Sequence, residues 1–439
     1  MTWQDRKRLA PETFDIDPRT REGYYSDAYF RNAASILEQL SAEGYRFSGE
    51  CPQLESQGVD VRRVNVGDIE VEMQVFTKRE PLTVACGVDY AVAILKQCMG
   101  YFDDSGKFHN TFTEHEVEAV HDGDLLAPWI PAAKIRGRYR DFAILETVVL
   151  GPLARLTRIA TNTYECLQAA GGKPVFMFGP RYDIPAAQAG DGYAYKIGVD
   201  RYNADAAADA PAMITTDAQG SWWGATGGGT TSHSLVLSFL GDTREAMLQF
   251  ARLIPVDVKR IALVDTSNDS VGTTVRCAKA FFARYMELMR AGKRDEARKY
   301  VLFGVRCDTA GERRDVAVEP TGDPGQDNGV VPRLVSAVRD ALDSLAGDPD
   351  IPPDDREEAD RYFRNVRIAV SGGFNPDRIA WFEREKAPVD VYGIGSFLQH
   401  GPTNDFIADV VRVKVDGRWY HMAKAGRESK PNPDLERVV

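Results

Sequence analysis

The second half of this chain alternates short apolar runs with segments of helical spacing, and this alternation limits the fold more than any other feature. Each run is short and mostly apolar, as expected for a strand covered on both faces. Repeated strand–helix units imply parallel strands. The pattern therefore predicts an α/β fold, either a barrel or an open doubly wound sheet. The five runs cover residues 173–179, 259–265, 301–308, 367–373 and 389–395.

The first part of the chain follows a different pattern. Apolar residues recur at helical spacing from Ser26 to Leu40. Residues 61–78 alternate as strands do, and residues 88–99 return to helical spacing. Residues 122–142 are typical of short strands broken by Gly and Pro. This region predicts a small α+β domain.

Three segments are expected to lie outside these cores. Residues 1–20 are polar and contain prolines, which is typical of an arm. Residues 309–329 and 347–360 are rich in Pro, Gly and charge, so we expect exposed insertions around one helix. The apolar stripe that this helix is expected to bury consists of Val331, Leu334, Val335, Val338, Leu342 and Leu345.

Composition excludes several classes of protein. The net charge of −11 argues against a nucleic-acid binder, which needs a basic surface, but a local cluster of arginines can still bind a small anion. The six cysteines lack the spacing of metal ligands, so we expect reduced thiols and no zinc. No segment approaches the roughly 20 apolar residues of a membrane span, and the charged N-terminus lacks a signal-peptide pattern. We therefore expect a cytoplasmic protein without a membrane partner.

Polar residues and glycines follow the apolar runs at the points where each run ends. In an α/β barrel the carboxyl ends of the parallel strands line the face that carries the active site. We therefore expect these residues to meet at one mouth. In chain order they are Phe178, Arg181, Asp265, Arg306, Asp308, Ser371, Gly372, Gly373, Gly393, Gly395 and Ser396.

The residue types at this mouth suit a ribose phosphate and an anionic aromatic ring. Two glycine turns late in the chain permit close approach of a phosphate to backbone N–H groups, where barrels often bind it. Arg181 and Arg306 can bind a carboxylate or pyrophosphate. Asp308 can bond ribose hydroxyls or hold a metal through water, and Phe178 can stack on a flat ring. Each feature alone is also typical of an ordinary turn, helix cap or core residue, so the prediction depends on their convergence.

One histidine, His233, stands where three glycines meet an apolar segment, in GGGTTSHSLVLSF. On these residues alone, capping or packing at the start of a helix is the simpler interpretation.

Seven segments in the correct order resemble those of the nicotinate phosphoribosyltransferase family. They extend from Tyr25 to Leu398 and so cover most of the chain. The segments are YSDAYF, LETVVLGPLARLTRIAT, VFMFGPRYD, GGGTTSHSLVLSF, LVDTSNDSVG, VRCDTAGE and SGGFNPDRIAWFEREKAPVDVYGIGSFL.

The resemblance implies an irregular α/β barrel with an α+β open-faced sandwich domain built from N- and C-terminal segments. The implied boundaries are 1–20 for the arm, 21–148 with 404–439 for the sandwich, and 149–403 for the barrel, which includes the 309–360 insertion. It also implies a homodimer with shared active sites. Within it, Tyr29 would reach the neighbouring subunit's site.

The resemblance also implies roles at the mouth. Phe178 would stack on a pyridine ring, Arg306 and Asp308 would contact the base or pyrophosphate and the ribose, and the glycine turns would cradle the 5′-phosphate. His233 would be phosphorylated by ATP. Further expected substrate-binding residues are Arg181, Thr230 and Asp265, with Ser371 and Ser396 at the phosphate.

The implied reaction transfers phosphoribosyl from phosphoribosyl pyrophosphate to nicotinate, giving nicotinate mononucleotide and pyrophosphate in NAD biosynthesis. It requires Mg²⁺ as cofactor and ATP as co-substrate. Two departures affect the choice of base: Tyr182 replaces the family's second arginine, and residues 308–312 differ from its Asp-Ser-Gly-Asp. The alternatives are quinolinate, nicotinamide or another pyridine or azole base as substrate, or a non-catalytic nucleotide-binding relative.

Overall fold

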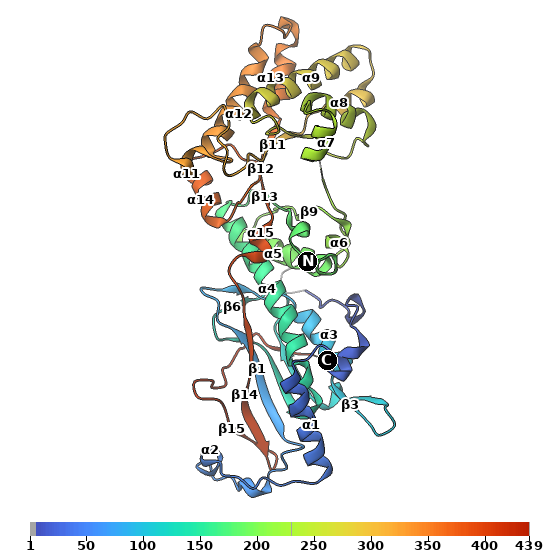
Figure 1. Cartoon of the computed structure of the whole chain (residues 1–439), viewed down its shortest axis with the longest axis vertical. Coiled ribbons are helices and arrows are strands. Elements are labelled where there is room, and N and C mark those ends of the chain that lie inside the picture. The colour runs from blue at the N-terminus through green and yellow to red at the C-terminus, as the bar shows by residue number, and fades with distance from the viewer. Residues whose placement is uncertain (1–5, 230, 439) are drawn as a thin grey trace. The chain divides into compact units, whose positions relative to one another are not determined.

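The computed structural model describes residues 6–229 and 231–438, which form two compact units. The first unit comprises Met1–Asn162, Ala194–Ala204 and His400–Val439, and the second comprises Thr163–Tyr193 and Asp205–Gln399. The division between them falls within two long helices, α4 (Glu146–Ala169) and α5 (Gln188–Ala206) (Figure 1).

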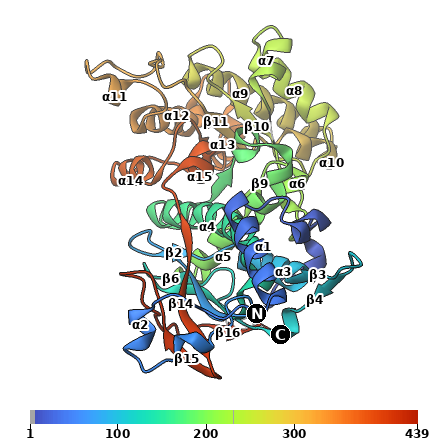
Figure 2. The same cartoon turned by 60° about the horizontal axis from the view of Figure 1, so that its bottom comes forward.

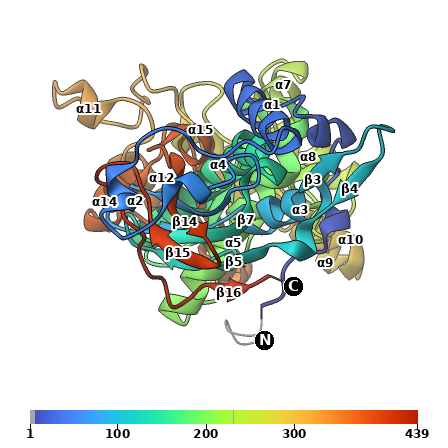
Figure 3. The ribbon, with the colours of Figure 1, turned by 90° about the horizontal axis from the view of Figure 1, so that it is seen from below.

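A six-stranded antiparallel sheet lies at the centre of the first unit, in the order β15–β14–β1–β7–β5–β16. The C-terminal strands lie beside strands from the first third of the chain (Figure 3). Both ends of the chain therefore build one sheet. Its strands are β1 (Glu70–Thr77), β5 (Glu116–Ala119), β7 (Pro131–Arg138), β14 (Phe406–Val415), β15 (Arg418–His421) and β16 (Glu436–Arg437).

One face of this sheet packs on α3 (Val88–Cys98) and forms the core of the unit. Val71, Met73 and Val75 of β1 lie on this face, as the alternating sequence predicts. The remaining described elements of the unit are α1 (Ala28–Ala42), α2 (Pro52–Glu55), β2 (Thr83–Val84), β3 (Gly100–Phe102), β4 (Phe108–Asn110) and β6 (Leu125–Leu126).

The described part of the N-terminal arm is anchored to α3. Arg8 forms an ion pair with Asp89, with 2.9 Å between Nη1 and Oδ1, and the ring of Phe14 stacks on Tyr90 with 4.7 Å between centroids. Phe14 is buried by this contact.

The opposite face of β1 is buried by charged and polar contacts. Glu72 is fully buried and accepts hydrogen bonds from Arg136, Arg412 and Ser429. Burial alone raises the pKa of Glu72, but these donors outweigh burial and hold the pKa below the ordinary value of 4.5. The neighbouring Gln74 accepts a bond from the Lys430 backbone N–H, so the C-terminal segment covers this face.

The second unit contains a six-stranded parallel sheet in the order β10–β11–β12–β13–β8–β9. Its edges, β9 and β10, are consecutive along the chain, so the described strands form a half-barrel. This confirms the predicted α/β class, with a parallel sheet in one part and an antiparallel sheet in another. The strands are β8 (Val175–Met177), β9 (Met213–Ile214), β10 (Ile261–Leu263), β11 (Gly304–Cys307), β12 (Arg367–Val370) and β13 (Val391–Ile394).

Helices connect the parallel strands. α9 packs against α8 and α12 near β10 and β11 (Figure 2). The helices are α6 (Asp217–Gly220), α7 (His233–Ser238), α8 (Thr243–Leu253), α9 (Ser270–Arg290), α10 (Arg294–Ala297), α11 (Pro324–Asp327), α12 (Pro332–Ser344), α13 (Arg356–Arg364), α14 (Pro376–Arg384) and α15 (Ser396–His400).

Residues 309–360, expected as an insertion, contain most of the connection from β11 to β12. The helix expected there is α12, and its predicted apolar stripe is buried. The flanking segments are not wholly exposed, however. Asp315 is fully buried and accepts bonds from the N–H and hydroxyl of Ser270 at the start of α9. The second segment runs into α13, which buries Ala359.

Replacing Glu72 with Gln should destabilise the first unit. Arg136, Arg412 and Lys134, whose Nζ lies 3.7 Å from Glu72 Oε1, then surround a neutral group. Breaking a buried ion pair costs about 3 kcal/mol. Because the folded pKa of Glu72 is lowered, its contribution is present above the unfolded pKa and is lost as the pH falls through the folded value. Urea denaturation should show a large deficit at pH 7 that shrinks below about pH 4.

The control is Glu70→Gln, because Glu70 lies on the same strand but is 43% exposed in its pair with Lys414. Its loss should stay within about 1 kcal/mol. Equal losses in the two variants would contradict the prediction.

Candidate functional site

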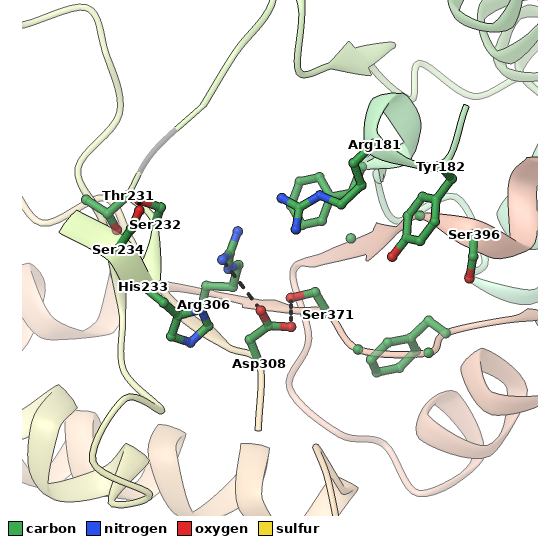
Figure 4. A pocket seen from close by; sticks show the side chains of 16 residues that line it. Arg181, Tyr182, Thr231, Ser232, His233, Ser234, Arg306, Asp308, Ser371 and Ser396 are labelled. Carbon is green, nitrogen blue, oxygen red and sulfur yellow. Dashed lines mark hydrogen bonds and ion pairs between the residues drawn. The ribbon is translucent and has the colours of Figure 1, made fainter. Parts of the chain in front are cut away.

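A cavity of about 430 Å³ opens at the carboxyl ends of the parallel strands of the second unit. In Figure 4, His233 and its neighbours lie on one side, Arg181 and Tyr182 on the other, and Arg306, Asp308 and Ser371 between them. The cavity is lined by Phe178, Arg181, Tyr182, Thr231, Ser232, His233, Ser234, Arg306, Asp308, Ser371, Gly372, Gly373, Phe374, Gly393, Gly395 and Ser396.

Strand topology explains this gathering. Phe178 directly follows β8, and its N–H donates to the Ile394 carbonyl at 2.7 Å, the last residue of β13. Arg306 lies in β11 and Asp308 just after it, while Ser371 directly follows β12. Parallel strands point their carboxyl ends to one edge, so residues far apart in sequence meet there.

Residues on either side of position 230 contact the two edge strands of the half-barrel. The Gly228 N–H donates to the carbonyl of Ile214 in β9 at 2.7 Å. The Thr231 hydroxyl donates to the carbonyl of Ile261 in β10 at 3.2 Å. A side chain at Gly227 would lie 2.7 Å from the Thr216 backbone, so this approach requires glycine. The residues that follow, from Thr231 to His233, line the cavity.

His233 is the first residue of α7 and is bonded to Asp265, which follows β10. The distance between His233 Nε2 and Asp265 Oδ2 is 2.9 Å. Burial raises the pKa of Asp265 above its ordinary value, and the bond from His233 partly offsets this rise. With Nε2–H donating to the carboxylate, the Nδ1 lone pair is free of this bond. A histidine held in this way is suited to act as a nucleophile.

A second polar group centres on Asp308. The Ser371 hydroxyl donates to Asp308 Oδ1 at 2.6 Å, and Arg306 Nη2 lies 3.6 Å from Oδ2. The Arg306 guanidinium also lies over the Phe178 ring, 5.4 Å from its centroid. Burial lowers the pKa of Arg306, although Asp308 opposes that shift. An aromatic face, a guanidinium and a fixed carboxylate therefore occupy adjoining parts of the cavity.

Several buried polar atoms around these groups have no hydrogen-bond partner within the described chain. Such atoms carry a desolvation cost that a polar ligand can relieve. They are Asp265 Oδ1, Thr266 Oγ1, Arg306 Nε and Thr309 Oγ1.

The two glycine pairs are required for different reasons. Gly372 and Gly373 have φ angles of 103° and 69°, which residues other than glycine rarely adopt. Gly393 has no such φ, but a side chain there would lie 2.4 Å from the Phe178 ring. Gly395 meets the Tyr182 ring in the same way, at 2.5 Å. Gly393 and Gly395 thus leave room for the rings of Phe178 and Tyr182. The expected role in phosphate binding does not account for this packing.

Three expected site residues are not among the described residues that line this cavity. Tyr29 lies on α1 of the first unit, is 62% exposed and donates a hydrogen bond to Asp27 at 3.2 Å. Thr230 lies outside the described residues. Asp265 does not line the cavity but forms a hydrogen bond with His233, which does.

Sequence reasoning missed other lining residues: Thr231, Ser232, Ser234 and Phe374, and Tyr182 as a wall of the cavity. The three hydroxyl residues directly flank His233, which was an available signal. The position of Tyr182 depends on the short 3₁₀ turn Gly179–Tyr182, which no periodicity indicates.

Within residues 6–229 and 231–438, no group of three or more His, Cys, Asp or Glu side chains is arranged to hold a metal ion. No helix in the described parts of the chain is long and apolar enough to cross a membrane.

Comparisons with known proteins match this chain to several phosphoribosyltransferases. The model of the quinolinate phosphoribosyl transferase N-terminal domain matches residues 59–157. Nicotinate phosphoribosyltransferase pncB2 of Mycobacterium tuberculosis is 24% identical over 335 residues, which cover 74% of this chain and 59% of that protein. The chain therefore spans less than two thirds of the length of this curated relative.

Solved structures extend the similarity across both units. The nicotinate-nucleotide pyrophosphorylase from Pyrococcus furiosus matches with a TM-score of 0.62 and 25% identity, covering 97% of this chain and 85% of that one. Human nicotinic acid phosphoribosyltransferase shares the fold, with a TM-score of 0.50 and 16% identity over 88% of this chain and 74% of that one. Together with the motifs and the half-barrel, these matches support a relationship to the type II phosphoribosyltransferases.

Proposed function

We propose that this protein transfers a phosphoribosyl group from phosphoribosyl pyrophosphate to nicotinate, giving nicotinate mononucleotide and pyrophosphate. The observation that carries the proposal is the single cavity in which an aromatic face, arginines and a glycine turn adjoin a His–Asp pair. The name of the mycobacterial relative supports nicotinate as the base.

The base would stack on Phe178, with its carboxylate toward a guanidinium. Arg306 already lies over this ring, and Arg181 lines the same cavity. The pyridine nitrogen carries its own lone pair, so the reaction requires no general base. Catalysis would therefore come mainly from alignment of the nitrogen with the anomeric carbon.

The ribose phosphate would lie between Asp308 and the glycine turn. Asp308 is fixed by Ser371, so its remaining lone pairs can accept bonds from ribose hydroxyls. The backbone at Gly372 and Gly373 is exposed and can bind the 5′-phosphate. Bond cleavage at the anomeric carbon develops oxocarbenium character, and the arginines would stabilise the departing pyrophosphate.

The residues present fit a Mg²⁺ ion that is brought in with the substrate. Asp308 lines the cavity and supplies a carboxylate just after β11, and the nearby Asp265 Oδ1, which is buried beneath the lining residues, has no hydrogen-bond partner within the described residues. Mg²⁺ is commonly held by one or two carboxylates together with substrate phosphates. When bound, the ion would neutralise charge on the leaving pyrophosphate.

ATP would phosphorylate His233. Its Nδ1 would attack the γ-phosphorus, forming an N–P bond as the bond to ADP breaks. Asp265 would accept the Nε2–H bond and stabilise the positive charge that develops on the ring. Hydrolysis of the phosphohistidine would couple ATP consumption to the transfer.

Quinolinate is the second candidate base. The matched N-terminal domain and the fold of the archaeal pyrophosphorylase favour it. Its two carboxylates require a strongly basic pocket, however, and Arg181 and Arg306 are the only arginines or lysines that line the described cavity. We therefore place nicotinate first.

A base panel tests the proposal directly. Purified protein with phosphoribosyl pyrophosphate and Mg²⁺ should form a mononucleotide from nicotinate, and ATP should increase the yield. Nicotinamide and quinolinate should give much less product, measured by chromatography with and without ATP. Product from quinolinate alone would overturn the assignment, and no product from any base would favour a binding role.

Replacing His233 with Ala should abolish transfer of labelled γ-phosphate from ATP to the protein. ATP-stimulated turnover should fall about 100-fold or more, as for other groups that act in the chemical step. The control is His109→Ala, because His109 also bonds an aspartate, Asp103, at 2.5 Å, but in the first unit. Full ATP-stimulated turnover in the His233 variant would exclude the phosphorylation role.

Replacing Gly393 with Ala tests the stacking role of Phe178. The new methyl group would lie 2.4 Å from the ring and must displace it. Loss of an aromatic contact is worth about 1.4 kcal/mol, so the KM for nicotinate should rise about tenfold. Gly347→Ala, where a side chain meets nothing within 4 Å, should leave the KM unchanged. An unchanged KM in both variants would argue against stacking at Phe178.

A further inference from the structure

Arg378, on α14, lies beside the Gly372–Gly373 turn but does not line the cavity itself. Its Nη1 lies 3.6 Å from the position that a Cβ at Gly373 would occupy. Its Nη2 donates to the Val330 carbonyl at 2.7 Å, and its guanidinium lies over the Phe374 ring at 4.9 Å. The side chain is therefore fixed between the turn and the part of the β11–β12 connection that directly precedes α12.

The Arg378 backbone is fixed as well. Its N–H donates to the Oδ1 of Asn375, the N-cap residue of α14, at 2.8 Å. Asn375 is only two residues beyond Gly373. The turn, the cap and the guanidinium thus form one short, connected unit that is preorganised before any ligand binds.

The charge of Arg378 has no counter-ion in the described chain. No Asp or Glu oxygen of these residues forms an ion pair with it, and burial alone accounts for its lowered pKa. Its Nε is buried without a hydrogen-bond partner. Other half-buried arginines of this unit have carboxylate partners: Arg306 with Asp308 and Arg339 with Asp343.

Arg260 is an arginine with a purely structural role, and backbone carbonyls accept its hydrogen bonds. Arg260 is almost completely buried and donates to the carbonyls of five residues. These are Ala251, Ile254, Pro255, Val258 and Lys299. Arg378 makes one such bond, so packing alone leaves most of its donors unused.

We propose that Arg378 is a phosphate-binding residue whose guanidinium is the counter-ion of a ribose phosphate monoester held on the Gly372–Gly373 turn. A partly desolvated cation is costly unless an anion faces it, and the exposed turn is the face on which an anion can arrive. The identity of the ligand as a ribose 5-phosphate rests on the proposed function; the cationic site itself rests on the geometry.

The test measures binding of ribose 5-phosphate by calorimetry to the full-length protein. Arg378→Met keeps the length of the stem but removes the charge, so the Kd should rise about tenfold or more, as for loss of a charge-assisted hydrogen bond. Inorganic phosphate should show the same loss, and ribose should show none. The control is Arg339→Met, which also removes a half-buried arginine that donates to two carbonyls. It should leave the Kd unchanged.

An unchanged Kd in folded Arg378→Met would overturn the proposal. If that variant does not fold, NMR of the wild-type protein decides. The Nε–H signal absent from Arg378→Lys identifies Arg378, and it should move when ribose 5-phosphate is added. A stationary signal would also overturn the proposal. Because ribose 5-phosphate carries neither base nor pyrophosphate, failure of nicotinate turnover would leave this result intact.

Discussion

The hydrogen bonds that connect the segment 227–233 to β9 and β10 determine what the half-barrel can do. The two edge strands are consecutive in the chain, yet they lie at opposite ends of the sheet. Gly228 bonds one edge and Thr231 the other, and two residues later His233 meets Asp265. These contacts hold the residues that precede His233 against both edges of the sheet, beside the cavity that His233 lines.

The same segment explains which features of the site could be predicted from sequence. Apolar runs identified five of the six parallel strands, since a strand buried on both faces must be apolar throughout. They missed β9, which is only Met213–Ile214 and too short to produce a pattern. Strand ends identified the mouth, because topology places every carboxyl end on one edge. The bond from His233 to Asp265 could not be predicted, since it depends on the path of the connection between β9 and β10.

The sequence also did not indicate which polar side chains are buried. The alternation in β1 is typical of a sheet with one wet face, yet Glu72 and Gln74 are buried because a segment more than 350 residues later covers them. Arg378 is similar: its residue type and position on a helix are typical of a solvated side chain. Its burial without a carboxylate partner among the described residues, and its closeness to Gly373, become visible only in the structure.

Charge within the cavity bears on the choice of base. The chain carries a net charge of −11, but among the described residues that line the cavity Arg181 and Arg306 face a single carboxylate, Asp308, and Arg378 lies nearby. A ribose phosphate and a pyrophosphate already require several cations, because each unpaired charge in a partly desolvated site is costly. Tyr182 packs its ring on Gly395 and adds no positive charge. Under the proposed function, a base with one carboxylate can be paired by a remaining guanidinium, whereas a second carboxylate would compete with the phosphates for the same few cations.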